Sequence, residues 1–171
     1  VSFGNFSRME GTATLSVIAP VSGSITTTQA AGFAGPWLSH TSGYGARTWG
    51  QVLDGQIVGG YAGDTTLATG QSLGAAPFTA TSNAHISSAT TGNVTVGAGI
   101  TYLNTLGSTD FLADRLVELA ASQTLRLGVQ GGIQVANGAQ DLTIGNAGVA
   151  STLSAGGTVT NTAGVLFLTN H

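Results

Sequence analysis

Four charged residues between positions 110 and 118 form the densest set of groups in the chain that could do acid–base chemistry. They are Asp110, Asp114, Arg115 and Glu118. A polysaccharide lyase or hydrolase needs two carboxylates, or carboxylates with a neighbouring Arg or Lys, on one face of the protein. In a helix Asp114 and Glu118 would share a face with Asp110, whereas in a strand the three would not line up. Because such clusters are commonly solvated surface charge, we interpret the set as a solvated charged patch and predict no catalytic residues.

The histidines do not indicate a metal site. His40 lies between Ser and Thr, His85 precedes an Ile, and His171 is terminal, so none has a second ligand at a metal-like spacing. The segment 59–64 resembles one copy of the Gly- and Asp-rich calcium nonapeptide of some β-helices, but that site needs several consecutive copies. We interpret this segment as an ordinary turn, and Asp54 as part of a hairpin turn. We therefore expect no bound metal and no cofactor.

Four aromatic residues in the first third of the chain are the best candidates for ligand recognition: Trp37, Tyr44, Trp49 and Tyr61. Aromatic faces stack on sugar rings, so the group could form a carbohydrate-binding surface. The alternative is that these rings pack a hairpin against the rest of the protein. We favour packing, because Trp is highly buried on average.

The elements that must position these residues are predicted from a repeated pattern in the second half. Between 123 and 169, short runs of alternating apolar and polar residues are separated by Gly or Asn breaks. Period-two alternation indicates strands, and runs this short and numerous are typical of a β-solenoid, in which each coil buries its inward residues by stacking on its neighbours. We expect the following residues to point inward on parallel rungs: Leu125, Leu127, Ile133, Val135, Leu142 and Ile144.

The remaining segments complete the predicted architecture. Asp54-Gly55 between two apolar runs predicts a β-hairpin with a type I′ turn, and 64–81 reads as a polar loop. The segment 110–121 fits either a short helix or a strand, and we favour a strand because it precedes a run of rungs. The predicted fold is all-β: a β-solenoid with parallel rungs and an irregular aromatic-containing hairpin and loop insertion. It is one segment, 1–171, divided into first coils (1–31), aromatic hairpin and polar loop (32–82) and regular coils (83–171).

Composition excludes several classes of protein. Charged residues make up only 6% of the chain, against roughly a quarter in an average globular protein, while 42% is hydrophobic. This combination is unlike a charged disordered chain. With four Arg, no Lys and a net charge of −3, no basic surface for nucleic acid or an anionic membrane is expected. The chain has no Cys for a disulfide framework and no run of ~20 apolar residues for membrane insertion.

The order of several segments resembles that of a known family. The matching stretches are 23–28, 32–37, Trp49, 54–58, 116–128, 131–133 and 152–169. They are similar to autotransporter-associated β-strand-repeat proteins, which are long, secreted surface proteins of bacteria. The resemblance implies a right-handed parallel β-helix passenger region that is exported and displayed at the cell surface. It carries over no catalytic motif.

From these observations we expect a non-enzymatic, extracellular β-solenoid that builds a surface fibre, stalk or matrix as part of a longer protein. A carbohydrate-binding adhesin module is the alternative, with surface polysaccharide as its partner, and a polysaccharide lyase or hydrolase comes third. The expected partners are further copies or adjacent repeats of the same chain, because an uncapped coil exposes a strand edge. His171 is the only titratable side chain after Asp141. The candidate self-association segment is Val165, Leu166, Phe167 and Leu168.

Overall fold

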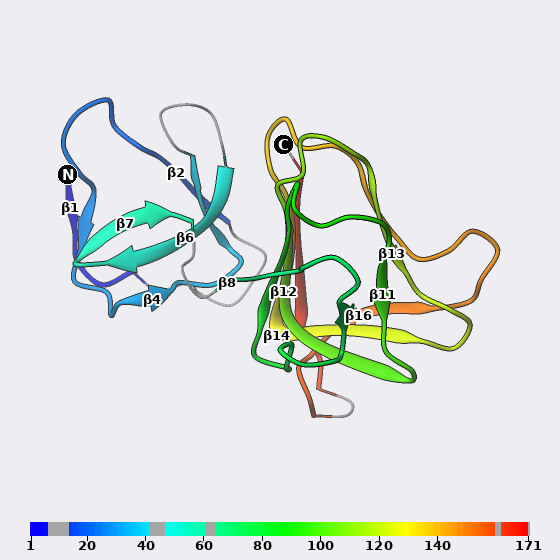
Figure 1. Ribbon diagram of the computed structural model, residues 1–171. Coiled ribbons are helices and arrows are strands. Elements are labelled where there is room, and N and C mark those ends of the chain that lie inside the picture. The colour runs from blue at the N-terminus through cyan, green and yellow to red at the C-terminus, as the bar shows by residue number, and fades with distance from the viewer. Residues whose placement is uncertain (7–13, 42–46, 61–63, 160–161, 171) are drawn as a thin grey trace. The chain divides into compact units, whose positions relative to one another are not determined.

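Every regular element in the described part of the chain is a β-strand, which confirms the predicted all-β class (Figure 1). The computed structural model describes residues 1–6, 14–41, 47–60, 64–159 and 162–170. The chain forms two compact units, Val1–Gly63 and Asp64–His171, which we call unit 1 and unit 2. Among the described residues, no helix has the length and apolar character that crossing a membrane requires.

Unit 1 is built on a seven-stranded sheet of mixed direction, in the order β1-β3-β7-β6-β5-β2 with β4 paired to β6. The pairs β1–β3 and β2–β5 are parallel, and the pairs between them are antiparallel. Strands β1 and β2 are therefore the two ends of this sheet. The strands are β1 (Ser2–Phe3), β2 (Leu15–Ile18), β3 (Thr26–Thr27), β4 (Gly32–Phe33), β5 (Leu38–Thr41), β6 (Arg47–Leu53) and β7 (Gln56–Gly59).

The predicted hairpin is present between β6 and β7. Asp54 and Gly55 form its two-residue turn, with φ values of 48° and 71°, and the ladder pairs Leu53 with Gln56 and Val52 with Ile57. Positive φ at both central residues is the requirement of a type I′ turn, which Asp-Gly satisfies at little cost. The role of Asp54 is therefore conformational.

Unit 2 is a β-solenoid, and every strand in it pairs in parallel with a strand of the neighbouring coil. Figure 1 shows β12 and β14 lying together, with β11 and β13 on another side of the coils. The strands are β8 (Asp64–Thr66), β9 (Ser72–Leu73), β10 (Asn83–Ile86), β11 (Val94–Val96), β12 (Ile100–Ser108), β13 (Arg115–Glu118), β14 (Thr124–Val135), β15 (Leu142–Ile144), β16 (Thr152–Ala155) and β17 (Val165–Asn170).

Each complete coil has three strand-bearing sides, because β12 and β14 both turn a corner. Their register pairs Leu103 with Leu127, shifts, and resumes with Thr105 opposite Gly132. Side one consists of β8, β10, the second halves of β12 and β14, and β17; side two of β9, β11, β13 and β15; side three of the first halves of β12 and β14, and β16.

The corners differ in length while the sides keep their register. Between the paired positions Leu103/Leu127 and Thr105/Gly132, β12 has one residue, Asn104, and β14 has four, residues 128–131, of which the last two pair with β17. A Cβ on Gly128 would overlap Oδ1 of Asn104, so a larger residue there would have to displace the Asn104 side chain. The spacing of paired residues grows accordingly, from 19 positions between Asp64 and Asn83 to 35 between Gln130 and Val165.

Apolar side chains from the three sides meet in one continuous core inside the coils. The predicted inward positions Leu125 and Leu127 are fully buried, Ile133 joins the same core, and Leu142 and Ile144 are half-buried against it. Val135 is only half-buried, because it is the last residue of β14 where the chain leaves side one. The alternation in the sequence thus identifies the core rungs of this part of the chain.

Uncharged polar side chains connect neighbouring coils, mostly at the corners. The Thr90 hydroxyl donates to the Leu67 carbonyl (2.7 Å), the Ser72 hydroxyl to the Thr95 carbonyl (3.0 Å), and the Gln123 amide to the Val96 carbonyl (3.2 Å). Each such bond contributes about 0.5–1.5 kcal/mol net and satisfies backbone groups that the strands leave unpaired. The abundance of Thr, Ser, Asn and Gln therefore has a structural cause.

The structure corrects where the coils begin. The predicted polar loop 64–81 contains β8 and β9, which pair with β10 and β11, so regular coils start at Asp64 and not at 83. In the segment 64–81, the side chains of Leu67 and Leu73 are fully buried. The small polar residues between them obscure the alternation of apolar and polar residues. The boundary between compact units lies after Gly63, within the predicted range 32–82. The segment 110–121 contains β13, as favoured, and Val117 is its buried rung residue.

We predict that Leu106→Ala lowers the free energy of unfolding by about 2–5 kcal/mol, because Leu106 is fully enclosed in the core. Leu112→Ala is the matched control: Leu112 is 79% exposed, and its loss should change stability by about 0.5 kcal/mol or less. Urea unfolding followed by far-ultraviolet circular dichroism measures both. Equal losses for the two variants would contradict this core assignment.

Candidate functional site

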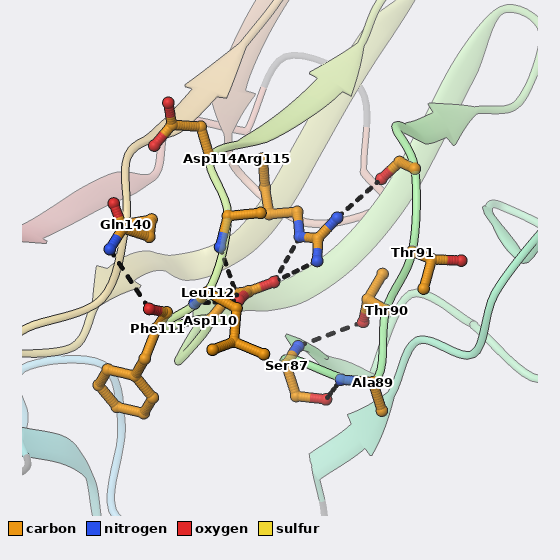
Figure 2. A network of polar contacts seen from close by, with 12 residues as sticks. Ser87, Ala89, Thr90, Thr91, Asp110, Phe111, Leu112, Asp114, Arg115 and Gln140 are labelled. Atoms are coloured by element: carbon orange, nitrogen blue, oxygen red, sulfur yellow. Dashed lines mark hydrogen bonds and ion pairs between the residues drawn. The ribbon is translucent and has the colours of Figure 1, made fainter.

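Asp110 is fully buried at the corner between β12 and β13, and Figure 2 shows that its carboxylate organises this corner. One oxygen, Oδ1, accepts the backbone N–H groups of Leu112 (2.8 Å) and Ala113 (3.2 Å). The other, Oδ2, lies 2.5 Å from both Nε and Nη2 of Arg115. Both oxygens of the carboxylate are thus engaged inside the protein.

The same corner is joined to the coils on both sides. The backbone N–H of Gln140, in the following coil, donates to the Asp110 carbonyl (2.7 Å). The Arg115 guanidinium reaches toward the preceding coil, where Nη1 lies 3.5 Å from the Gly92 carbonyl oxygen. A buried charge is tolerated only when it is paired and hydrogen-bonded. Asp110 and Arg115 meet that condition by linking three successive coils.

The pKa of Asp110 is set by two opposing influences. Burial alone would raise the pKa of this carboxyl, because desolvation penalises the charged form. The hydrogen bonds from Leu112, Arg115 and Ala113, together with the positive charge of Arg115, outweigh burial and hold the pKa below its ordinary value. Asp110 is therefore a carboxylate at neutral pH and a poor proton donor.

The other carboxylates of the cluster have separate structural partners. Oδ1 of Asp114 accepts the Asp141 N–H (3.2 Å), and Oε1 of Glu118 accepts the Asn93 side-chain amide (2.6 Å). Each of these bonds joins neighbouring coils. The interpretation of this cluster as a solvated patch is therefore wrong for Asp110, which is fully buried, and each of the three carboxylates has a different partner.

The two described histidines are mostly buried and lie in different units. His40, in β5, is paired in register with Val17 and Thr48, and burial lowers its pKa. His85, in β10, has Nε2 at 2.7 Å from the Thr109 hydroxyl, and burial likewise lowers its pKa. His171 lies outside the described residues. Within the described ranges, no three His, Cys, Asp or Glu residues gather into a group that could hold a metal ion.

Asp64 is a titratable residue whose environment the sequence did not reveal. It begins β8, opposite Asn83, and its Oδ1 atom is buried with no hydrogen-bond partner among the described residues. Burial raises its pKa to about 7. A carboxyl with such a pKa resembles a general acid, but among the described residues it belongs to no cluster of three or more His, Cys, Asp or Glu side chains. In the sequence the residue follows Gly-Tyr-Ala-Gly and reads as a turn.

Of the two described aromatic candidates, one lies in the interior and the other packs against a second aromatic ring. Trp49 is 3% exposed and makes an edge-on contact with Phe33, with 6.4 Å between ring centroids. Trp37 is half-buried and packs edge-on against Phe6 at 5.8 Å. Tyr44 and Tyr61 lie outside the described residues. The buried Trp49 ring offers no face to a sugar, so the packing interpretation fits this residue.

The predicted self-association segment forms most of β17, on side one of the last coil. Phe167 is buried, Val165 and Leu166 are half-buried, and Leu168 is 69% exposed. Strand β17 pairs with β14, and β15 and β16 each pair with one strand of the preceding coil. No second sheet neighbour is recorded for these three strands among the described residues. Strands β15 and β16 of the last coil therefore each have an edge with no ladder partner among the described residues.

An apolar groove in unit 1 was not predicted from the sequence. It has a volume of about 260 Å³ and is lined by Phe3, Phe6, Ile25, Ile57 and the four residues of β2. Val17 and Ile57 belong to the small core of the unit, so the groove opens onto that core. Its lining comes from segments distant in the sequence, and only the alternation of Leu15 and Val17 hinted at a buried face.

No family model, curated protein or solved structure matches this chain. The family resemblance of the sequence therefore remains an expectation.

We predict that Asp110→Asn lowers the free energy of unfolding by about 3–5 kcal/mol at neutral pH, because it leaves the mostly buried Arg115 without a counter-charge. Since the folded-state pKa of Asp110 is lowered, its stabilising effect is present above the ordinary Asp pKa and is lost as pH falls through the lowered value. Wild type and variant should therefore converge in acid. The control is Asp114→Asn at an exposed position; urea denaturation over a pH series that gives both variants the same loss would refute the assignment.

Asp64→Asn should have the opposite effect. The pKa of Asp64 is about 7 in the folded protein against an ordinary value of 3.8, so the unfolded chain loses its proton first as pH rises. The wild type should lose stability between about pH 4 and pH 7, and the variant should lack that loss. Urea midpoints at pH 4.5, 6 and 8 measure the difference, and parallel pH profiles for the two proteins would rule this out.

Proposed function

We propose that this chain is a segment of an extracellular structural β-solenoid that builds a surface fibre, stalk or matrix by end-to-end association. The single observation that carries the proposal is the chemistry of the last coil. Residues 142–170 contain no charged side chain, and among the described residues β15 and β16 each pair with a strand on one side only. Natural proteins block such edges with charges, proline or a covering segment, because an open edge templates further pairing.

The way in which the coils are joined also supports a structural role. Neighbouring coils are connected by backbone ladders and by hydrogen bonds of uncharged side chains, which ionic strength screens little. The carboxylates of Asp114 and Glu118 also accept hydrogen bonds from neighbouring coils. A repeat array held in this way gains stability with every coil added to it.

The geometry favours the two alternative functions less. A carbohydrate-binding adhesin would need exposed aromatic faces, and among the described candidates Trp49 is buried while Trp37 is half-covered by Phe6. A polysaccharide lyase or hydrolase would need converging carboxylates, and those at Asp110, Asp114 and Glu118 are held apart by separate partners.

We predict that the purified chain forms concentration-dependent oligomers or fibres and that Leu168→Lys abolishes them. Leu168 is 69% exposed on β17, so a lysine there should place charge at the strand edge without disturbing the upstream core. Leu112→Lys, at an exposed corner position, is the matched control and should assemble normally. Sedimentation velocity and electron microscopy measure the outcome. A wild-type chain that stays monomeric at high concentration would refute the proposed function.

A further inference from the structure

A pocket lies in the first two coils of unit 2, where side three begins. It has a volume of about 290 Å³, which is near the lower end of the usual range for small-molecule sites and far more than one water fills. Its lining combines small residues, two turn residues and the start of β12: Gly74, Gly97, Ala98, Thr79, Ala80, Ile100, Thr101 and Tyr102.

The β12 part of the lining includes a free strand edge. On side three β12 is the first strand, and among the described residues its first half, 100–103, pairs with β14 alone. The segment 75–82 of the preceding coil forms turns instead of a strand, so it does not extend the ladder. It meets β12 at the corner, where the Asn104 N–H donates to the Ser82 carbonyl (2.9 Å). A short stretch of the edge is therefore left without a ladder partner.

The neighbouring hydrogen bonds show which backbone groups of that edge are free. The Gly99 carbonyl accepts the Thr124 N–H (2.8 Å) and so points toward β14. Because a peptide is planar and trans, the N–H of Ile100 points the opposite way, and alternation along the strand gives Tyr102 the same orientation. Both residues line the pocket. Their N–H and C=O groups are thus directed away from β14, on the side where the ladder is missing.

The turn that forms another part of the lining is held by its own hydrogen bonds. The Thr79 N–H donates to the Ser82 hydroxyl (2.9 Å), and the Ser82 N–H donates to the Thr79 carbonyl (3.0 Å). Phe78, directly before the turn, is buried in the core of the coils. The Thr79 side chain is exposed and its hydroxyl lies 3.2 Å from that of Thr81. The lining is therefore organised in advance, which lowers the entropic cost of binding.

The lining indicates a ligand that is uncharged and rich in hydroxyl groups. None of the residues recorded in it is charged. Arg126, the register partner of Tyr102, is engaged by the carbonyls of Gly157 (2.8 Å) and Thr162 (3.0 Å), so an anion would find no free cation there. A sugar hydroxyl both donates and accepts, which matches free N–H and C=O groups, and a pyranose face stacks on an aromatic ring such as that of Tyr102.

An extended peptide matches this edge less well than a sugar does. A strand added here would bond to Ile100 and Tyr102, but the next outward-facing N–H, at Asn104, is already taken by Ser82. Peptides that extend a sheet draw their affinity from a run of main-chain hydrogen bonds. Two residues of free edge provide too short a run.

We propose that this pocket binds a neutral pyranose unit, with the ring of Tyr102 as the stacking platform and the backbone groups of Ile100 and Tyr102 as hydrogen-bond partners. The site goes beyond the proposed structural function and does not depend on it. It lies in the first two coils, whereas the candidate self-association segment belongs to the last one.

Saturation-transfer difference NMR on the full chain tests the site, with cellobiose, maltose, lactose and glucuronate as probes. At least one neutral sugar should give a saturable signal, and glucuronate should give none. Tyr102→Ala should weaken binding by about tenfold, whereas Tyr102→Phe, which keeps the ring, should bind nearly as well as the wild type. Ala98→Leu should abolish binding, because the added side chain occupies the pocket. Ala121→Leu, at an exposed position of the same corner one coil later, is the matched control and should bind normally.

The other outcomes would overturn the inference. It is wrong if none of the three neutral sugars binds, or if Ala98→Leu and Tyr102→Ala both bind like the wild type. Displacement of the sugars by tetra-alanine would assign the edge to a peptide, and equal binding of glucuronate would contradict a neutral ligand. Leu168→Lys should bind the sugars unchanged, so a failure of end-to-end association and a failure of sugar binding are observed separately.

Discussion

The parallel pairing of each coil with the next determines where nearly all the remaining side chains and backbone groups of unit 2 lie. Because the ladders repeat residue by residue along three sides, they bring positions about 20 to 30 apart in the sequence into contact. Side chains that face inward are therefore stacked in columns, and apolar residues of moderate size are enough to fill the core. Backbone groups at the corners have no ladder partner, so that is where polar side chains are required.

Asp110 is the strongest example of that requirement. A buried corner has to satisfy the N–H groups of Leu112 and Ala113, and a carboxylate accepts both with one oxygen. Its charge then demands a cation, and Arg115 supplies one from the next strand. The densest charged cluster in the sequence is thus explained by the geometry of a turn. Only 6% of the residues in the chain are charged, and the charges at this corner hold neighbouring coils together.

The sequence predicted those parts of the fold whose information is local. Leu125 and Leu127 show their inward direction through simple alternation, and Asp54-Gly55 fixes its own turn. The first coil was missed because β9 has only two residues and is defined by its neighbour β11, not by its own pattern. The burial of Trp49, the raised pKa of Asp64 and the apolar groove depend on residues brought together from distant segments. No period or spacing could disclose them.

The unequal corners carry a consequence for how such a chain diversifies. One residue at Asn104 and four at residues 128–131 connect the same two sides without disturbing the register on either. Length is constrained along the rungs and nearly free where rungs meet, since lengthening a loop adds little closure entropy. Insertions at these corners would project outward from the coils, each at a defined position along the solenoid. New binding surfaces can therefore be added at one corner at a time, while the coils that carry them stay unchanged.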